Sequence, residues 1–433
     1  MRAKDGAESL PVPCASMKPK SGFNPQLENC LGSIPAEIER VVLAFSGGVD
    51  SCVLLHLLKS YPRRFKTQLW HVNHGLQDIA DEMEAFCKSV ADRYELDIEV
   101  SHLNLDPETA NLESEARKAR YALFEQALTP GDCLLTAHHA DDQVETFLLN
   151  ILRGSGSAGL RGIAYRRPIG RSLLLRPLLD VSRVEISAYA LAHQIEWYDD
   201  PSNLSDRFNR NYLRHQVIPK IKNRWPGYLE SIRSVIAIQV ETQQALDELG
   251  AQDYHHVRYQ NEQESSDLLC RKTLHQLTPP RQKNLIRYWL KKYHCASLPQ
   301  SRLNELVRQL NSRADSMPVV SGSGYEIRIY NQCLYIVSQE SRVPLHETYD
   351  FDISTKLKIS EIGLELERRS IFQHLRQKDS GQSIKLKFRL NNNDSNPDIH
   401  RLKRLFQKHK IPPWKRSLTP QVYLDDELAG LWY

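Results

Sequence analysis

Residues 41–51 read VVLAFSGGVDS, a run of five apolar residues followed by a short polar segment with two adjacent glycines. An apolar run of this length is typical of a strand that is buried on both faces. Gly47 and Gly48 leave backbone N–H groups accessible to an anion, and the N-terminus of a following helix adds partial positive charge. Ser46 and Ser51 can donate hydroxyl hydrogen bonds to the same anion. The stretch therefore predicts an anion-binding loop between a buried strand and a helix.

The carboxylate of Asp50 restricts what this loop can bind. It repels a bare phosphate, so Asp50 fits best if Mg²⁺ lies between the two groups. A glycine turn with serine capping is the alternative interpretation. The chain has no GxxxxGK[ST] segment, which argues against the P-loop that transfers a γ-phosphoryl group.

The segment SGGVDS resembles the pyrophosphate-binding loop of the N-type ATP-pyrophosphatases, or PP-loop enzymes. The resemblance implies that ATP is broken between its α and β phosphates and that a carbonyl oxygen is adenylated. It implies ATP and Mg²⁺ as cofactors, with the metal at Asp50. The residues that it places at the nucleotide are Ser46, Gly47, Gly48, Val49, Asp50 and Ser51.

Short apolar runs alternate with longer amphipathic runs between residues 39 and 220. We expect strands over 41–45, 68–73, 97–103, 133–138 and 173–177. We expect helices over 51–59, 81–94, 109–128, 142–153 and 183–193, the last opened by a capping box of Ser182 and Glu185. This alternation predicts a doubly wound α/β domain with a parallel sheet, in which ligands bind beyond the carboxyl ends of the strands.

The rhythm changes after this domain. Residues 221–312 are expected to be mostly helical, with a loop over 259–267, and short strands follow over 325–330 and 333–337. A mixed α+β segment with an amphipathic helix over 399–409 ends the chain. We therefore predict a flexible extension (1–36), a PP-loop catalytic domain (37–220), a mainly helical middle domain that binds substrate (221–345) and a small basic C-terminal domain (346–433).

Composition narrows the class of protein. The mean hydropathy is −0.50 and no run of about 18 apolar residues occurs, so no membrane span is expected. Eight cysteines are scattered without a CxxC pair, which indicates neither a zinc site nor an iron–sulfur cluster. They are typical of reduced thiols in a cytoplasmic protein.

Positive charge is concentrated near the C-terminus. Residues 371–416 contain twelve Lys and Arg against three Asp, a local net charge of +9. Such a block is either a solvated surface or a surface for a polyanion, of which nucleic acid is the obvious example.

Four further segments resemble the tRNA(Ile)-lysidine synthase family: HVNHGLQ (71–77), ESEARKARY (113–121), HHADDQVET (138–146) and DDPSNLSDRFNRNYLRHQVIP (199–219). The segment 401–423 resembles the end of that family more loosely. The resemblance implies ligation of free lysine to carbon 2 of the wobble cytidine of a CAU-anticodon isoleucine tRNA. ATP first adenylates the cytidine and releases pyrophosphate, and the lysine amine then expels AMP.

Adenylation needs a cation beside the α-phosphate, and the lysine amine must lose a proton. Arg117 is our candidate for the cation, and an ion pair with Glu113 is the alternative. Asp141 is assigned to lysine or its metal, whereas Asp142 and His138 are further catalytic candidates that could instead be a helix cap and a polar strand edge. Glu145 could equally be structural.

The remaining candidates contact substrate. His74 is expected at the nucleotide. Arg210 and Arg214 are expected at the anticodon loop or substrate, with a domain-boundary salt bridge as the alternative. Arg404 and Lys408 are expected on the tRNA, as is Trp414, unless Trp414 is a buried anchor.

Other functions stay open at this point. A cytidine thiolase and an amide-forming synthetase share the PP-loop, and a tRNA-binding protein with a relic nucleotide fold would be no enzyme. The sequence leaves the oligomeric state open, a homodimer included.

Overall fold

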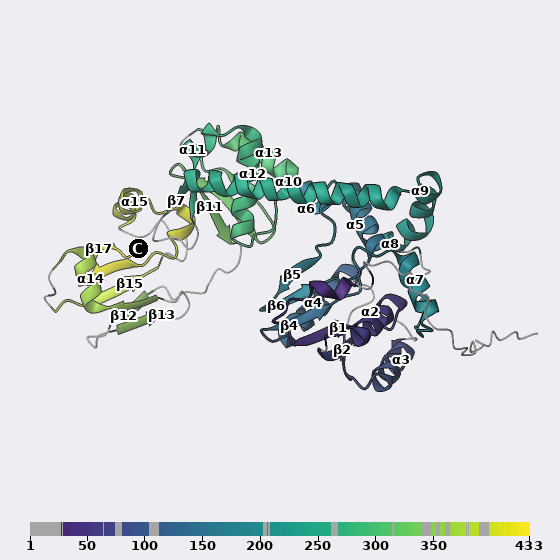
Figure 1. Cartoon of the computed structure of the whole chain (residues 1–433). Helices are drawn as coiled ribbons and strands as arrows, with labels where there is room; N and C mark the ends of the chain where they lie inside the picture. Colours follow the sequence, from purple (N-terminus) through teal and green to yellow (C-terminus); the bar gives the residue numbers. More distant parts are fainter. Residues whose placement is uncertain are drawn as a thin grey trace, which may run out of the picture. The chain divides into compact units, whose positions relative to one another are not determined.

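The computed structural model divides into two compact units, Met1–Gln243 and Gln244–Tyr433, which are treated separately below (Figure 1). Our three predicted boundaries, at residues 36, 220 and 345, stay predictions. The structure describes residues 27, 29–63, 65–73, 80–103, 112–201, 206, 208–260, 267–313, 316–338, 348–351, 356–359, 364–377, 379, 381–388 and 398–433. Most of the predicted N-terminal extension lies outside these residues.

The first unit is built on a six-stranded sheet with the order β3-β2-β1-β4-β6-β5. All neighbouring pairs are parallel except β5 and β6, which form an antiparallel edge. The strands are β1 (Arg40–Ala44), β2 (Lys66–Asn73), β3 (Asp97–His102), β4 (Asp132–Leu135), β5 (Arg166–Ile169) and β6 (Ser172–Leu175). The predicted doubly wound parallel sheet is confirmed.

Helices cover both faces of this sheet because successive strand residues point to opposite sides. Val41 and Leu43 of β1 pack with α2, α3 and α7, whereas Val42 packs with α4. These helices are α2 (Val49–Ser60), α3 (Ala80–Arg93), α4 (Leu112–Ala127) and α7 (Arg183–Ala192). Alternation within one short strand thus gives the sheet two separate apolar cores.

Two details differ from the sequence prediction. β4 ends at Leu135 and not at residue 138, so the two histidines lie in the connection to α5 (Ala140–Leu152). The edge strand β5 was missed because its residues RRPI carry no apolar run, and Pro168 suits an edge position only.

Short helical segments complete the first unit. α6 (Ser157–Leu160) follows α5, and α8 (Asn209–Tyr212) passes through a π-helical turn (Leu213–Val217) into α9 (Ile218–Arg224). Val144 of α5 packs with Leu213 and Ile218 in a small separate core. The helix α10 (Tyr228–Val257) then runs through the point where the two units divide.

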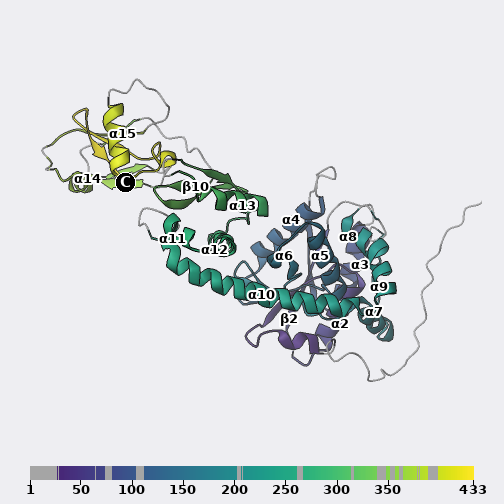
Figure 2. The same cartoon turned by 90° about the horizontal axis from the view of Figure 1, so that it is seen from above.

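The second unit begins with helices packed on a sheet. In Figure 2, α12 lies beside the carboxyl-terminal part of α10, and Asn284 of α12 donates to the Leu246 carbonyl at 2.7 Å. The helices are α11 (Arg271–Gln276), α12 (Pro279–Lys292) and α13 (Gln300–Gln309). The sheet has the order β7-β8-β11-β10-β9, with β7 (Arg258–Tyr259), β8 (Leu268–Cys270), β9 (Val319–Ser321), β10 (Tyr325–Tyr330) and β11 (Cys333–Ser338). Strands β10 and β11 confirm the strands predicted over 325–330 and 333–337.

The end of the second unit is a four-stranded sheet, β12-β15-β16-β17, with α14 (Arg368–Leu375) and α15 (Ile399–Lys408) on opposite faces. Its strands are β12 (Thr348–Phe351), β15 (Ile384–Lys387), β16 (Gln421–Leu424) and β17 (Glu427–Leu431). A separate hairpin joins β13 (Lys356–Ile359) to β14 (Leu364–Glu367). The expected amphipathic helix is confirmed, since α15 buries Leu402 and Phe406.

The helices of the described residues include none with both the length and the apolar content that crossing a membrane requires.

Candidate active site

The loop between β1 and α2 has the geometry expected of an anion site. Ser46 and Ser51 lie with their hydroxyl oxygens 3.2 Å apart, and the Gly48 N–H points to the Ser46 hydroxyl at 3.4 Å. The helix α2 begins at Val49, so its first N–H groups have no carbonyl partner within the helix. Donors and the positive end of α2 therefore converge at the carboxyl end of β1.

Gly47 cannot be replaced without strain. Its φ is +79°, in the left-handed region, and an added Cβ would lie 3.0 Å from the Cys87 sulfur. The carbonyl of Gly47 accepts hydrogen bonds from the Tyr198 N–H at 2.9 Å and from the Cys52 thiol at 3.3 Å. The loop is thus held against α2, α3 and the chain that follows α7.

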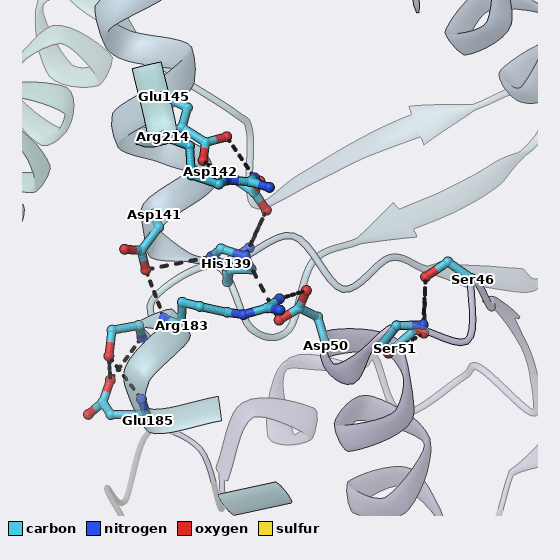
Figure 3. Close-up of polar contacts among 12 residues, drawn as sticks. Ser46, Asp50, Ser51, His139, Asp141, Asp142, Glu145, Arg183, Glu185 and Arg214 are labelled. Atoms are coloured by element: carbon cyan, nitrogen blue, oxygen red, sulfur yellow. Dashed lines mark hydrogen bonds and ion pairs between the residues drawn. The ribbon is translucent and has the colours of Figure 1, made fainter. Parts of the chain in front are cut away.

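Asp50 is the charged centre of the site (Figure 3). Its Oδ2 is ion-paired with the guanidinium of Arg183 at the start of α7. Its Oδ1 is buried and has no hydrogen-bond donor among the described residues, with His139 Nε2 3.9 Å away. A carboxylate oxygen without a donor beside a phosphate loop fits Mg²⁺, which commonly binds one or two carboxylates together with phosphate oxygens. No cluster of three or more metal-ligating side chains occurs within the described ranges.

The start of α5 brings a second carboxylate group to this place. Asp142 caps the helix by accepting from the His139 N–H at 3.0 Å, as the capping alternative expects, and its catalytic role stays a prediction. Asp141 accepts from the Arg183 N–H at 2.7 Å and lies 3.7 Å from His139 Nδ1. The β1 and β4 ends are adjacent in the sheet, which is why Asp50 and α5 share one site.

The charges around His139 shift the pKa values of the group. Burial alone would lower the pKa of His139, but the nearby carboxylates, chiefly Asp142, outweigh burial and raise it. Burial alone would raise the pKa of Asp142, but His139 and Arg210 hold it at about 2. Burial alone would raise the pKa of Asp141, but its interaction with His139 and the hydrogen bond from the Arg183 N–H together lower it. Both aspartates are therefore ionised at neutral pH.

His138 has the opposite electrostatic environment. Its pKa is lowered to about 3, chiefly by burial, with a further contribution from the positive charges of Arg176 and Arg117 and an opposing effect of Asp142. Thr136 Oγ1 lies 2.9 Å from Nδ1 and fixes the orientation of the ring. Arg117 thus lies close enough to the site to influence His138, while the side chain of its alternative partner, Glu113, is outside the described part.

Arg210 and Arg214 form the salt bridges that the sequence left as an alternative. Their Nε atoms lie 2.6 Å from the two carboxylate oxygens of Glu145, whose side chain is 1% exposed. Arg210 Nη2 also lies 3.3 Å from Asp142 Oδ1. The four-residue spacing of Arg210 and Arg214 along the helical segment places both side chains on the same side, towards Glu145.

Four predicted residues remain: His74, Arg404, Lys408 and Trp414. His74 is outside the described residues. Arg404 and Lys408 are exposed on α15. Trp414 is half-buried, with its ring centroid 5.3 Å from that of Tyr335 and Arg328 Cζ 5.1 Å from its ring, which favours the anchor over base stacking.

Sequence reasoning missed Arg183. The sequence around it was used only for its capping box, which is confirmed: the Ser182 N–H donates to Glu185 at 2.8 Å. A usable signal was present, because a cation at the first position of a helix opposes the helix dipole and therefore needs another reason to be there.

Three protein-family models match successive parts of this chain. The PP-loop domain family matches residues 19–221, the TilS substrate binding domain matches 269–335, and the TilS substrate C-terminal domain matches 383–431. The tRNA(Ile)-lysidine synthase of Coxiella burnetii is 35% identical over 90% of this chain and 87% of its own. The chain belongs to the tRNA(Ile)-lysidine synthase family.

Other members of the tRNA(Ile)-lysidine synthase family agree. That of Photobacterium profundum is 34% identical, covering 93% of each chain, and that of Serratia proteamaculans is 33% identical over 90% of each. Among solved structures, a U34-tRNA thiolase from Methanococcus maripaludis with its [4Fe-4S] cluster is similar with a TM-score of 0.42 and 19% identity, over 49% of this chain and 77% of its own. The PP-loop match indicates ATP binding, in agreement with the motif at 46–51.

Proposed function

We propose that this chain ligates free lysine to carbon 2 of the wobble cytidine of a CAU-anticodon isoleucine tRNA, using ATP and releasing pyrophosphate and AMP. The observation that carries the proposal is the convergence of Asp50, His139 and Asp141 at the ends of adjacent strands, in a chain that matches the family over most of its length. Because ATP, lysine and tRNA occur together in the cytoplasm, we place the reaction there.

The loop holds the pyrophosphate part of ATP. The N–H groups at the start of α2 and the hydroxyls of Ser46 and Ser51 donate to the phosphate oxygens. Asp50 is the residue that would hold Mg²⁺, and the ion would neutralise charge on the phosphates.

Arg117 stabilises the charge that develops on the α-phosphate as the cytidine oxygen attacks. Its guanidinium lies over the Tyr121 ring at 5.2 Å and forms no ion pair with any carboxylate of the described residues.

Asp141 binds the ammonium group of the incoming lysine. It is the most exposed of the three carboxylates of α5, at 27% for the side chain against 13% for Asp142 and 1% for Glu145. Glu145 and Arg210 act as positioning residues that keep Asp142 and the start of α5 in place.

The amine forms its bond to carbon 2 as the bond from carbon 2 to the AMP oxygen breaks, and one amine proton must leave. The ring of His138 is unprotonated at neutral pH, since its pKa is about 3. When its Nδ1–H donates to Thr136, Nε2 is an acceptor for that proton. His138 and Asp141 are thus the two groups that we assign to proton removal.

The basic C-terminal domain contributes affinity for the tRNA. Arg404 and Lys408 on the exposed face of α15 can contact backbone phosphates, which fix position but not sequence. We assign no tRNA contact to Trp414, because its ring packs on Tyr335. A homodimer stays a hypothesis, which a native mass measurement would test.

Mass analysis of the wobble nucleoside tests the proposal. Purified protein is incubated with ATP, labelled lysine and either the CAU-anticodon isoleucine tRNA or a methionine tRNA. We expect lysidine in the first tRNA and none in the second, with one pyrophosphate released per lysine incorporated. Modification that requires a sulfur donor and not lysine would replace the proposal by the thiolase alternative.

A further inference from the structure

Tyr121 on α4 is surrounded by four arginines from three elements. The guanidinium carbons of Arg167 and Arg120 lie 4.7 Å and 6.0 Å from its ring centroid, and that of Arg117 lies 5.2 Å away. Arg176, which follows β6, approaches the Tyr121 hydroxyl at 3.4 Å. The arginines come together because the first part of α4, the start of β5 and the end of β6 meet in the fold.

This concentration of positive charge has no counter-charge in the described part of the chain, where none of the four arginines forms an ion pair with a carboxylate. The electrostatic consequence is visible on Tyr121. Burial would raise the pKa of Tyr121, but Arg117 and Arg176 outweigh burial and lower it. Guanidinium groups that repel one another are stable together when an anion lies among them.

The four arginines differ in what they can do. Arg176 is 2% exposed and donates to the Ala164 carbonyl, so it is part of the framework. Arg120 and Arg167 are partly buried, and the guanidinium of each lies against the Tyr121 ring. Arg117 is already assigned to the α-phosphate of ATP.

We propose that Arg120 and Arg167, supported by Tyr121, bind a backbone phosphate of the tRNA anticodon loop beside the nucleotide that is modified. This inference rests on the proposed function. ATP and RNA both carry phosphates, and the fold favours RNA here. Arg117 is the member of the cluster that we assign to ATP. The ATP loop follows β1, whereas Arg167 lies on the edge strand β5, three positions from β1 in the order of the sheet.

The cluster still lies next to the reaction centre. The pKa of Arg120 is lowered by burial and by the positive charges of Arg117 and Arg210. Arg120 is therefore close to Arg210. The positive charges of Arg117 and Arg176 likewise help to lower the pKa of His138. A phosphate held at Arg120 would therefore place the adjoining nucleotide near His138 and Asp141.

The test uses the full chain with Arg120→Met and Arg167→Met, and Arg166→Met as the matched control. Arg166 neighbours Arg167 on β5 but is exposed and faces away from it along the strand. Binding of the CAU-anticodon isoleucine tRNA is measured over a range of salt concentrations, and binding of a fluorescent ATP analogue is measured separately. Thermal unfolding without ligands is recorded for each variant.

We expect each variant to weaken tRNA binding about four-fold at roughly 0.15 M salt and to lower the salt slope by about 0.7, the contribution of one phosphate on a single strand. ATP affinity should stay the same, and the unfolding temperature should stay the same or rise, since a repelling charge is removed. The control should keep the salt slope.

Three results would overturn the inference: an unchanged salt slope, a loss of ATP affinity with tRNA binding intact, or a lower unfolding temperature that marks the arginines as structural. The charge-preserving Arg120→Lys and Arg167→Lys variants should retain most of the slope. The binding slope does not depend on catalysis, so a wild-type chain that makes no lysidine would refute the proposed function separately.

Discussion

The guanidinium of Arg183 is ion-paired with Asp50, while the backbone N–H of the same residue donates to Asp141 at 2.7 Å. One residue at the start of α7 thereby connects the carboxylate of the ATP loop with the carboxylate that we assign to lysine. The guanidinium of Arg183 thus occupies the position at Asp50 that a Mg²⁺ ion bound with ATP would take. Binding of Mg²⁺ at Asp50 must therefore compete with Arg183.

Arg183→Met removes that competition. The pair is partly exposed, and such ion pairs contribute about 0.2–1 kcal/mol. The Mg²⁺ concentration for half-maximal binding of a fluorescent ATP analogue should therefore fall by about two- to five-fold. Arg153→Met, an exposed arginine that follows α5, is the control and should leave the Mg²⁺ requirement unchanged. A higher Mg²⁺ requirement would mean that Arg183 helps to hold the metal.

Asp50→Asn keeps the size of the side chain but removes its charge. We expect pyrophosphate release to fall by at least about a hundred-fold, since the metal loses its carboxylate ligand. Affinity for tRNA, measured by filter binding, should stay close to that of the wild type. Equal loss of both would show that Asp50 maintains the fold and has no role at the metal.

Glu145→Gln leaves two arginines facing a single remaining carboxylate. Removing one partner of a buried ion pair typically costs about 3 kcal/mol, and Glu145 is the buried member here. Chemical denaturation should show a loss of that size. Glu230→Gln, in an exposed ion pair with Arg233, is the comparison and should change stability by less than about 0.5 kcal/mol. Similar effects of the two variants would argue against a structural role of the Glu145 pair.

His138 makes the fold sensitive to acid. Its folded pKa of about 3 lies below its unfolded value of 6.5, so the unfolded chain binds the proton more readily between these values. Stability is then fully present above pH 6.5 and is lost as the pH falls towards 3. Denaturation at several pH values should show that His138→Gln loses less stability than the wild type below about pH 6. NMR of the labelled histidine should show no titration between about pH 5 and pH 8; a midpoint near 6.5 would contradict the assigned environment.

Arg404→Met combined with Lys408→Met tests the C-terminal domain. Because each phosphate contact adds to the salt dependence of binding, the salt slope for the isoleucine tRNA should fall by about one to two units. The rate of ATP binding to the first unit should not change. Lys272→Met, outside the basic segment, serves as the control. An unchanged salt slope would show that the basic helix α15 is a solvated surface without contacts to tRNA.

The fold was predictable where the sequence carries strong periodic patterns. The buried strand 41–45 and the amphipathic helix 399–409 were found because their apolar spacing depends on local geometry alone. The edge strand β5 was not found, because its pairing with β6 is a contact between chain segments and leaves no apolar run. The end of β4 was placed three residues too late for a similar reason: Thr136 still hydrogen-bonds to Leu175, but the chain has left the strand.

The sequence by itself determined the ATP loop, since glycines, serines and an aspartate next to a buried strand have few other uses. It also determined the family, through motifs that are local in the chain. Only the tertiary structure decided which charges meet: Arg183 with Asp50, Arg210 and Arg214 with Glu145, and the arginines around Tyr121. The physical reason is that electrostatic interactions depend on distance in space. Apart from Arg117 and Arg120, which share α4 with Tyr121, these partners are separated by 46 to 133 positions along the chain and are brought together by the ends of the strands.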